Sequence, residues 1–311
     1  MQNKITLSPF NSLQLFGHDN LFDNLHTLIN TNKLPNTLLF SGDKGSGKFT
    51  LINHLLMNFF DSNNYDIKKK KITKSIIYKK IITGTFQNII YLNNTVEKKI
   101  KIDEIRELKK KLFTTCLNSL PRFIILDNVE TFNINCINAL LKILEEPSVN
   151  NFFILIDNKN KDLVKTILSR CTKIQINLSK IEREKISKLL LDQTGNESII
   201  NIQNSNLTPG SYLKFNNLCI SNNIFNDMNY IEKINILLQL FKKTKNIDLI
   251  DMAIFFTDQY YYEKSVKEVN NVCFYSNAKI KTINEINNFV LYNMNIRPIL
   301  NSIITNTEYD R

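Results

Sequence analysis

Short runs of Ile, Leu and Phe alternate with longer stretches of helical periodicity through the first 180 residues of the chain. A short run that is apolar at every position is typical of a strand buried on both faces, as in a parallel sheet. The pattern therefore predicts repeated β-α units in an α/β fold. The expected strands are residues 37–40, 88–92, 122–126, 152–156 and 173–176.

The stretches between these runs carry apolar residues at helical spacing. They predict helices over residues 48–60, 102–116, 133–146 and 161–168, and the third is expected to end at Pro147. Because crossovers between parallel strands are right-handed, the helices are expected to cover both faces of the sheet.

Strand patterns stop near residue 180. Helical stretches follow at 181–191, 230–241, 247–262 and 280–304, the last with an interruption at Pro298. Gly195 and the pair Pro209-Gly210 break the chain between them. A length of 311 residues favours two or three domains. We predict an α/β domain over 1–179, a small helical lid module over 180–221 and an all-α C-terminal domain over 222–311.

Three of the seven glycines lie in one turn between the first strand and its helix. Glycines there let backbone N–H groups close around phosphate oxygens, while the following helix directs its positive end at them. Lys48 would reach the outer phosphates as a point charge. An ordinary glycine-rich turn is the alternative. We predict a P-loop nucleotide site made of Gly42, Asp43, Lys44, Gly45, Ser46, Gly47, Lys48, Phe49 and Thr50.

The position after the loop lysine departs from the usual pattern. Ser or Thr normally stands there and holds Mg²⁺, whereas this chain has Phe49, with Thr50 one place later. An offset of one residue on a helix rotates a side chain by roughly 100°. We therefore expect Thr50 to miss the metal ion.

A second candidate site ends the apolar run 122–126. Asp127 lies where an NTPase holds Mg²⁺, directly or through water. A glutamate would normally follow and polarise the attacking water, but Asn128 has no basic oxygen with which to do so. Asp127 alone could equally be a turn residue. The phosphate loop makes a metal-facing role the better hypothesis.

Composition leaves two interpretations of the net charge of +11 open. Clustered Lys and Arg bind nucleic-acid phosphates through counterion release, so a DNA-facing surface is one. A bias toward Lys, Asn and Ile, with few Gly, Pro and Trp, is also expected of an AT-rich genome whatever the protein does. We interpret the four lysines at 68–71 as a solvated loop.

The five cysteines, at 116, 136, 171, 219 and 273, form no Cys-x-x-Cys pair and have no His at ligand spacing. We expect free thiols and no metal-ligand set. The N-terminus lacks the apolar core of a signal peptide, and no run of about twenty apolar residues occurs. A cytoplasmic protein without a membrane contact is expected.

A third candidate site is Arg170, in the tetrapeptide LSRC at 168–171. An arginine at a helix end often only caps carbonyl groups. In this chain, however, the decapeptide NALLKILEEP at 138–147 precedes Arg170 by one predicted strand, and this setting favours a functional role for the arginine.

These segments in this order resemble the AAA+ clamp-loader family, which opens sliding clamps at replication forks. The resemblance covers essentially the whole chain. The pairing of NALLKILEEP with Ser-Arg-Cys is highly specific. The other matching segments are FGH at 16–18, GDKGSGK at 42–48, FIILDN at 123–128 and Asn158 at the end of the fourth strand.

Motor subunits of that family carry Thr or Ser after the loop lysine, Asp-Glu on the second motif, and an arginine in the small module that contacts the γ-phosphate. The corresponding residues here are Phe49, Asn128 and Gly210, and all three changes weaken hydrolysis. The Ser-Arg-Cys triplet survives. The resemblance implies that Arg170 enters the ATP site of a neighbouring subunit as a finger, a combination similar to delta-prime subunits of bacterial DNA polymerase III.

The resemblance implies further partners and cofactors. The partners are the gamma/tau and delta subunits, the sliding clamp, and primer-template DNA, which Lys142 would face. The cofactor is ATP or ADP with Mg²⁺ in a degenerate site that also includes Asp127 and Asn158. Relatives often carry four zinc-binding cysteines in the region that is 61–86 here, but this chain has none there, so no zinc is expected. The C-terminal helices would form an oligomerisation collar.

Two other functions fit part of the pattern. A gamma/tau-like motor ATPase would use Lys48 and Asp127, with Thr50 if the helix start were shifted. A P-loop nucleotide kinase would need a basic lid for a second phosphate group, and the C-terminal third offers no such cluster. The leading hypothesis is a delta-prime subunit with weak or absent ATP hydrolysis of its own.

Overall fold

The computed structural model describes residues 9–95, 98–112, 120–145 and 150–308. The chain divides into two compact units, each described here by itself. One comprises Met1–Gly195 with Asn206–Ser211, and the other Asn196–Ser205 with Tyr212–Arg311. The three-domain division with borders at 179 and 221 stays a prediction.

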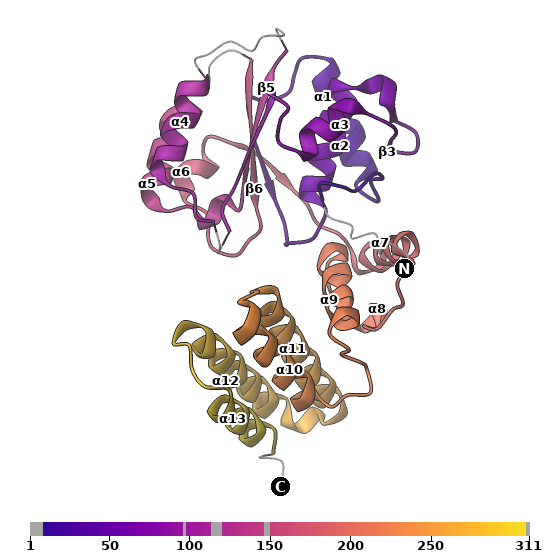
Figure 1. The fold of residues 1–311 in the computed structure, drawn as a ribbon, viewed down its shortest axis with the longest axis vertical. Coiled ribbons are helices and arrows are strands. Elements are labelled where there is room, and N and C mark those ends of the chain that lie inside the picture. Colours follow the sequence, from indigo (N-terminus) through magenta and orange to yellow (C-terminus); the bar gives the residue numbers. More distant parts are fainter. Residues whose placement is uncertain (1–8, 96–97, 113–119, 146–149, 309–311) are drawn as a thin grey trace. The chain divides into compact units, whose positions relative to one another are not determined.

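A five-stranded parallel sheet in the order β4-β5-β6-β1-β7 forms the centre of the first unit (Figure 1). All five predicted strands are confirmed, with every end within one residue. The strands are β1 (Thr37–Ser41), β4 (Ile89–Asn93), β5 (Arg122–Asp127), β6 (Asn151–Asp157) and β7 (Thr172–Gln175).

The order and direction of the strands in the sheet determine where the polar sites lie. β1 lies between β6 and β7, with Leu39 opposite Leu155 and Lys173. Every residue of β1 is buried, as its apolar sequence predicts. Since all five strands run in one direction, their carboxyl ends share one edge of the sheet, where ligands bind in open α/β folds.

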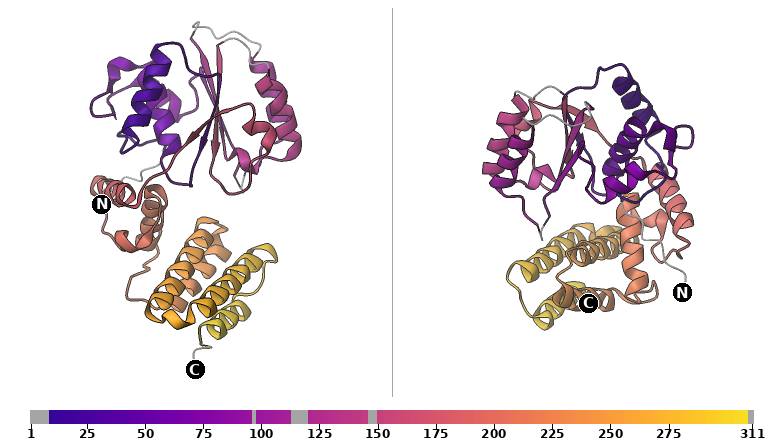
Figure 2. Two further views of the ribbon diagram at one scale, coloured as in Figure 1. Left: turned by 180° about the vertical axis from the view of Figure 1, so that it is seen from behind. Right: turned by 45° about the horizontal axis from the view of Figure 1, so that its top comes forward.

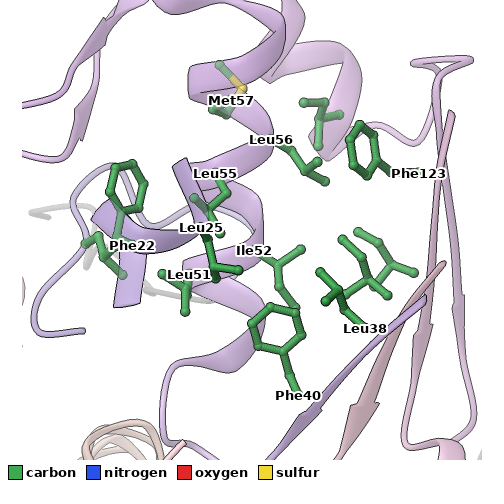
Figure 3. Close-up of a cluster of buried hydrophobic side chains, with 14 of the residues drawn as sticks. Phe22, Leu25, Leu38, Phe40, Leu51, Ile52, Leu55, Leu56, Met57 and Phe123 are labelled. Carbon is green, nitrogen blue, oxygen red and sulfur yellow. The ribbon is translucent and has the colours of Figure 1, made fainter. Parts of the chain in front are cut away.

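Helices cover both faces of the sheet, as predicted (Figures 1 and 2). On one face lie α1 (Asp19–Asn30), α2 (Lys48–Phe60) and α3 (Ile76–Ile82); on the other lie α4 (Ile102–Leu112), α5 (Ile134–Glu145) and α6 (Lys165–Leu168). The sheet therefore separates two cores. Figure 3 shows the first, in which α2 places Ile52 and Leu56 toward the strands and Leu51 and Leu55 toward Phe22 and Leu25 of α1.

Helix boundaries agree with the sequence where a cap is present. Helix α2 spans the predicted residues, and α5 begins after Asn133, whose side chain accepts a hydrogen bond from Cys136 N at 2.8 Å. Helix α6 is shorter than expected, because the extended backbone of Val164 delays its start until Lys165. The predicted ends of the second and third helices, at 113–116 and 146, lie outside the described residues.

The sequence did not predict α1 or the elements of residues 61–86. That segment contains a 3-10 turn (Ser62–Asn64), the hairpin β2 (Tyr65–Asp66) and β3 (Lys71–Ile72), and helix α3. Polar contacts hold these short elements together. Ser75 donates to Asp61 and accepts from Tyr78 N at 3.0 Å, which caps α3.

Lys70 joins this segment to α1. Its side chain is only 10% exposed, and its Nζ lies 2.7 Å from Asp19 Oδ1 and 3.5 Å from Asp23 Oδ1. The same Nζ lies 5.4 Å from the centroid of the Phe22 ring. Charge pairing therefore links the lysine-rich hairpin to the body of the unit.

The remaining chain is helical within the described residues, as predicted from residue 180 onward. The helices are α7 (Lys180–Thr194), α8 (Ile202–Ser205), α9 (Pro209–Ser221), α10 (Tyr230–Thr244), α11 (Asp248–Lys267), α12 (Val272–Leu291) and α13 (Ile296–Glu308), with a 3-10 turn at Val269–Asn271. Another 3-10 turn, Val129–Thr131, follows β5 in the first unit. Gly195 ends α7 with a φ of 64°, which confirms the predicted break.

The interruption predicted at Pro298 is wrong in position. The chain leaves the helical path between Leu291 and Ile296, and Pro298 lies inside the first turn of α13. A proline is tolerated there because the first turn of a helix has no intrahelical acceptor for its N–H groups. Across the described ranges, none of the helices is both long and apolar enough to cross a membrane.

We predict that Lys70→Met lowers the free energy of unfolding by about 1 kcal/mol, and the melting temperature by roughly 2 °C. Methionine keeps the packing of the aliphatic stem but removes the charge that Asp19 and Asp23 share. Thermal denaturation measures the change. The matched control is Lys71→Met at the exposed neighbouring position. Equal melting temperatures for the two variants would show that the pairing contributes nothing.

Candidate functional site

The predicted phosphate loop follows β1 directly and leads into α2. Gly45 and Gly47 adopt φ angles of 81° and 90°, in the left-handed region where a side chain is strained. The helix begins at Lys48, so its first N–H groups face the loop. This backbone has the geometry that phosphate-binding loops need, and glycine is required at both positions.

Lys48 is buried beneath the loop, with 4% of its surface exposed. Its Nζ donates to Gly42 O at 2.7 Å and to Asp43 O at 2.8 Å. Burial lowers the pKa of Lys48 to about 8, although the nearby carboxylate of Asp127 acts in the opposite direction. The ammonium group therefore binds carbonyl groups of its own loop, in the region where the outer phosphates of a nucleotide would lie.

Two segments distant in sequence fasten the loop. His18 Nε2 donates to Ser46 O at 2.7 Å. On another side, Thr208 Oγ1 donates to Lys44 O at 2.6 Å, and the Gly210 N–H donates to Gly45 O at 2.9 Å. The segment 206–211 is therefore hydrogen-bonded to the backbone of the phosphate loop.

Gly210 packs directly on the phosphate loop. A Cβ atom at Gly210 would lie 2.9 Å from both the Cα and the O of Gly45, which is closer than Cβ atoms approach backbone. Backbone packs on backbone here, so any side chain at residue 210 would force the two segments apart. Glycine at position 210 is thus a requirement of this packing.

Asp43 forms ion pairs at the rim of the loop. One of its carboxylate oxygens lies 3.4 Å from Lys159 Nζ, and the other lies 3.2 Å from Arg183 Nη2 on α7. Arg183 also donates to Leu178 O and Asn206 O, at 3.0 and 3.2 Å. A single arginine thereby connects the loop, the start of α7 and the segment 206–211.

Asp127 ends β5, as predicted, and three donors surround its carboxylate. Tyr91 Oη donates to Oδ2 at 2.9 Å, while Asn128 N and Asn158 Nδ2 donate to Oδ1 at 2.8 and 3.2 Å. Burial raises the pKa of Asp127 despite these bonds. Among the described residues Thr50 is not one of its donors. The carboxylate is hydrogen-bonded to protein groups on both oxygens.

Phe49 explains why Tyr91 can occupy this place. The Phe49 ring lies 5.0 Å from Tyr91 and 4.4 Å from Phe10, between centroids, and Phe10 lies 5.1 Å from Tyr91. Three rings therefore pack together at the position after the loop lysine, beside the Tyr91 hydroxyl that donates to Asp127. Asp127, the carboxylate that would face Mg²⁺ in a nucleotide site, is thus bonded on both oxygens to protein donors.

The carboxyl edge of the sheet also holds Asn93, which the sequence analysis did not single out, beside the predicted residues Asn128 and Asn158. Asn128 Nδ2 donates to Asn93 Oδ1 at 2.7 Å, and Asn158 Nδ2 donates to Asn128 Oδ1 at 2.8 Å. Side-chain amides thus connect the ends of β4, β5 and β6. The available signal was a polar residue at the end of each of these predicted strands, because parallel strands bring such residues to one edge.

Arg170 lies at the opposite end of the sheet from the phosphate loop. It precedes β7, whose first residue, Thr172, pairs with Leu38 near the start of β1. The loop begins after Ser41, at the far end of β1, so roughly 13 Å of strand separates the two sites. The structure does not bring Arg170 to the nucleotide loop of its own chain.

Lys142 is exposed in the last turn of α5, one turn before Glu145. Helix α5 runs back from the end of β5 toward the start of β6, and so ends at the same edge as Arg170. The structure therefore places Lys142 away from the phosphate loop as well. Within the described part of the chain, no group of three or more His, Cys, Asp or Glu side chains is placed to hold a metal ion.

The strand order, the loop after β1 and the acidic residue ending β5 define a P-loop domain of the AAA+ class. A family model described as "DNA polymerase III, delta subunit" matches residues 17–180 of this chain. The match covers more than half of the sequence. The chain belongs to this family of DNA polymerase III clamp-loader proteins.

Individual relatives include subunits of different kinds. The DNA polymerase III subunit gamma of Buchnera aphidicola from Acyrthosiphon pisum is 28% identical over 57% of this chain and 47% of its own length. The delta' subunit of Pseudomonas aeruginosa is 38% identical over 29% of this chain and 28% of its own length. The chain thus spans less than half the length of these curated relatives.

A solved structure with a similar fold is the DNA polymerase III gamma subunit-related protein of Thermotoga maritima. It has a TM-score of 0.48 and 15% sequence identity, and the alignment covers 93% of this chain and 99% of that one.

We predict that Lys48 titrates with a pKa of about 8, since burial disfavours its charged form. Its Cε resonance, followed by NMR from pH 6 to pH 11 and assigned by its loss in Lys48→Met, measures the value. Any phosphate affinity of the loop should fall as the pH rises through 8, because the lysine then loses its charge. A midpoint near the ordinary value of 10.5 would mean that the ammonium group is solvated.

Proposed function

We propose that this chain is a delta-prime subunit of a DNA polymerase III clamp loader, which helps to load the sliding clamp onto primed DNA. The observation that carries the proposal is the contrast between the two ends of the sheet. At the carboxyl end, protein groups occupy the places of the metal ligand and the attacking-water residue. At the amino end, Arg170 keeps the triplet of an arginine finger.

Weak or absent hydrolysis by the chain itself follows from its contacts. Asp127 is hydrogen-bonded to three protein donors, and Asn128 cannot act as a base. Phe49 replaces the hydroxyl that would hold Mg²⁺, and Gly210 leaves no space for the arginine that would contact a γ-phosphate. ATP or ADP binding to the loop would therefore be structural, with little turnover.

Arg170 acts on the ATP of a neighbouring motor subunit in this proposal. The strand length that separates it from its own loop supports an action in trans. An arginine finger stabilises charge on the transferred phosphoryl group and accounts for roughly 10³ to 10⁵ in rate. The chain would thus contribute to catalysis in the DNA polymerase III holoenzyme at a site formed with another subunit.

The proposed partners are the gamma/tau and delta subunits, the sliding clamp and primer-template DNA. Exposed apolar side chains in the second unit support subunit contacts through the C-terminal helices, as in a collar. Near the end of α11 and the turn after it, Tyr262, Val266 and Val269 are exposed by 67%, 59% and 72%. Tyr262 and Val266 lie four residues apart on α11 and so share one face of the helix, while Val269 begins the 3-10 turn that follows it.

A reconstituted clamp loader tests the finger. We predict that Arg170→Ala lowers the clamp- and DNA-stimulated ATPase rate by at least about 100-fold at the site it serves, since the finger's charge is then lost. The matched control is Arg106→Ala, which removes an exposed arginine on α4 that pairs with Asp103. If the two variants lower the rate equally little, Arg170 is not a finger.

A gamma/tau-like motor is the second candidate function, because Lys48 and Asp127 are retained and a gamma subunit is among the relatives. The purified chain separates the two functions. Little ATP turnover is expected of a delta-prime subunit. Robust turnover that Lys48→Ala abolishes would support the motor and overturn the delta-prime proposal.

Lys142 provides the test of DNA contact. If it binds a phosphate, Lys142→Ala should weaken loader–DNA binding and reduce the slope of log K against log salt by roughly one. The measurement is a fluorescence-anisotropy titration at several salt concentrations. Lys188→Ala, which removes an exposed lysine on α7, is the control. An unchanged slope for Lys142→Ala would remove this residue from the DNA interface.

A further inference from the structure

Arg170 is already bound within its own chain. Its Nε and Nη2 atoms donate to Glu145 Oε1, at 3.1 and 2.5 Å. On the other side of the guanidinium, Nη1 donates to Thr166 O at 3.0 Å and to Ser169 Oγ at 3.3 Å. The last residue of α5 and the segment around α6 thus hold the side chain from two directions.

These contacts leave the guanidinium little capacity for another anion. An arginine has five N–H donors in a rigid planar arrangement. The four bonds use four of them, among the described residues. A bidentate contact with a phosphate needs two N–H groups on one edge of the plane, so Arg170 must release Glu145 before it can bind a phosphate in this way.

We propose that Glu145 is a positioning residue that stores Arg170 in a resting conformation and releases it to the γ-phosphate of a neighbouring subunit. This inference rests on the proposed finger role of Arg170. It deepens that role by assigning a regulator to the finger. Glu145 and the nucleotide phosphate compete for the same edge of the guanidinium.

The partial exposure of Arg170 and Glu145 allows their ion pair to form and break reversibly. The Arg170 side chain is 32% exposed and that of Glu145 is 49% exposed. Water screens an ion pair at such a surface, so its attraction is weak. A γ-phosphate carries more negative charge than a carboxylate and offers three oxygens, so it competes successfully once it approaches.

The resting pair also makes the availability of Arg170 depend on the position of α5. Glu145 ends this helix, and its position relative to α6 determines whether the pair can form. Lys142 lies one turn earlier on the same helix. A shift of the end of α5 by an ångström or two would lengthen the bonds to Glu145 beyond hydrogen-bond distance and free Arg170. The Glu145–Arg170 pair thereby lowers the ATPase rate of a loader that has not bound clamp and DNA.

Glu145→Gln in the reconstituted loader tests the store, because it removes the charge and keeps the shape. We expect the ATPase rate without clamp and DNA to rise about two- to five-fold, the range of a weak surface pair. The gain should appear in kcat and leave KM unchanged, since only the finger's availability changes. The fully stimulated rate should stay the same, because the finger is then already released.

Three further proteins complete the experiment. Glu107→Gln, an exposed position on α4, controls for loss of an acidic side chain. The double variant Glu145→Gln with Arg170→Ala should show no gain over Arg170→Ala alone, because there is no finger left to release. Glu145→Ala, with its melting temperature recorded, repeats the test without the amide.

The possible outcomes distinguish an error in the resting Glu145–Arg170 pair from an error in the proposed finger role of Arg170. If Arg170→Ala lowers the stimulated rate but Glu145→Gln leaves the unstimulated rate unchanged or lower, the store is wrong and the finger stands. If the double variant keeps the gain, Glu145 acts on something other than Arg170 and the store is wrong as well. If Arg170→Ala has no effect, both the finger and the store are overturned.

Discussion

Parallel alignment of five strands gives the sheet two chemically different edges, and each candidate site depends on that difference. At the carboxyl edge, the turns that follow β1, β5 and β6 bring Lys48, Asp127 and Asn158 together. At the amino edge, the turns that precede β6 and β7 bring the end of α5 close to Arg170. A chain that folds this way keeps Arg170 away from its own phosphate loop. In the proposed function, the division between cis and trans roles therefore originates in the direction of the strands.

Burial of charged groups determines the hydrogen bonding at the carboxyl edge. A carboxylate and an ammonium group lie in the interior there, and each needs compensation for its lost hydration. Lys48 obtains it from loop carbonyls, and Asp127 from Tyr91 and the adjacent amides. Asn93, Asn128 and Asn158 extend this compensation across three strands. The phosphate loop and the ends of β4, β5 and β6 are consequently held by hydrogen bonds among the chain's own residues.

Much of this architecture is predictable from the sequence, for identifiable reasons. The buried strands are continuous apolar runs, and Gly45 and Gly47 mark a turn that only glycine tolerates, so the sheet and the loop could be placed. The hairpin near Lys70 escaped prediction because its elements are two residues long and long-range polar contacts stabilise them.

Contacts between distant segments also could not be predicted from the sequence. The partners of Arg170 and Asp127 could not be derived, because no local pattern pairs Glu145 with Arg170 or Tyr91 with Asp127. The packing of Gly210 on Gly45 also joins residues far apart in the sequence. Pro298 was misplaced for a different reason, since a proline in the first turn of a helix and a proline that ends one look alike in sequence.

The contact between Gly210 and Gly45 has an evolutionary consequence. An arginine at position 210 would place its Cβ 2.9 Å from both the Cα and the carbonyl oxygen of Gly45, where backbone cannot give way as a flexible side chain can. Such a substitution would displace the segment 206–211 and remove its bonds to the loop. If the chain acts as the proposed delta-prime subunit, a single mutation at this position therefore could not turn it into a motor.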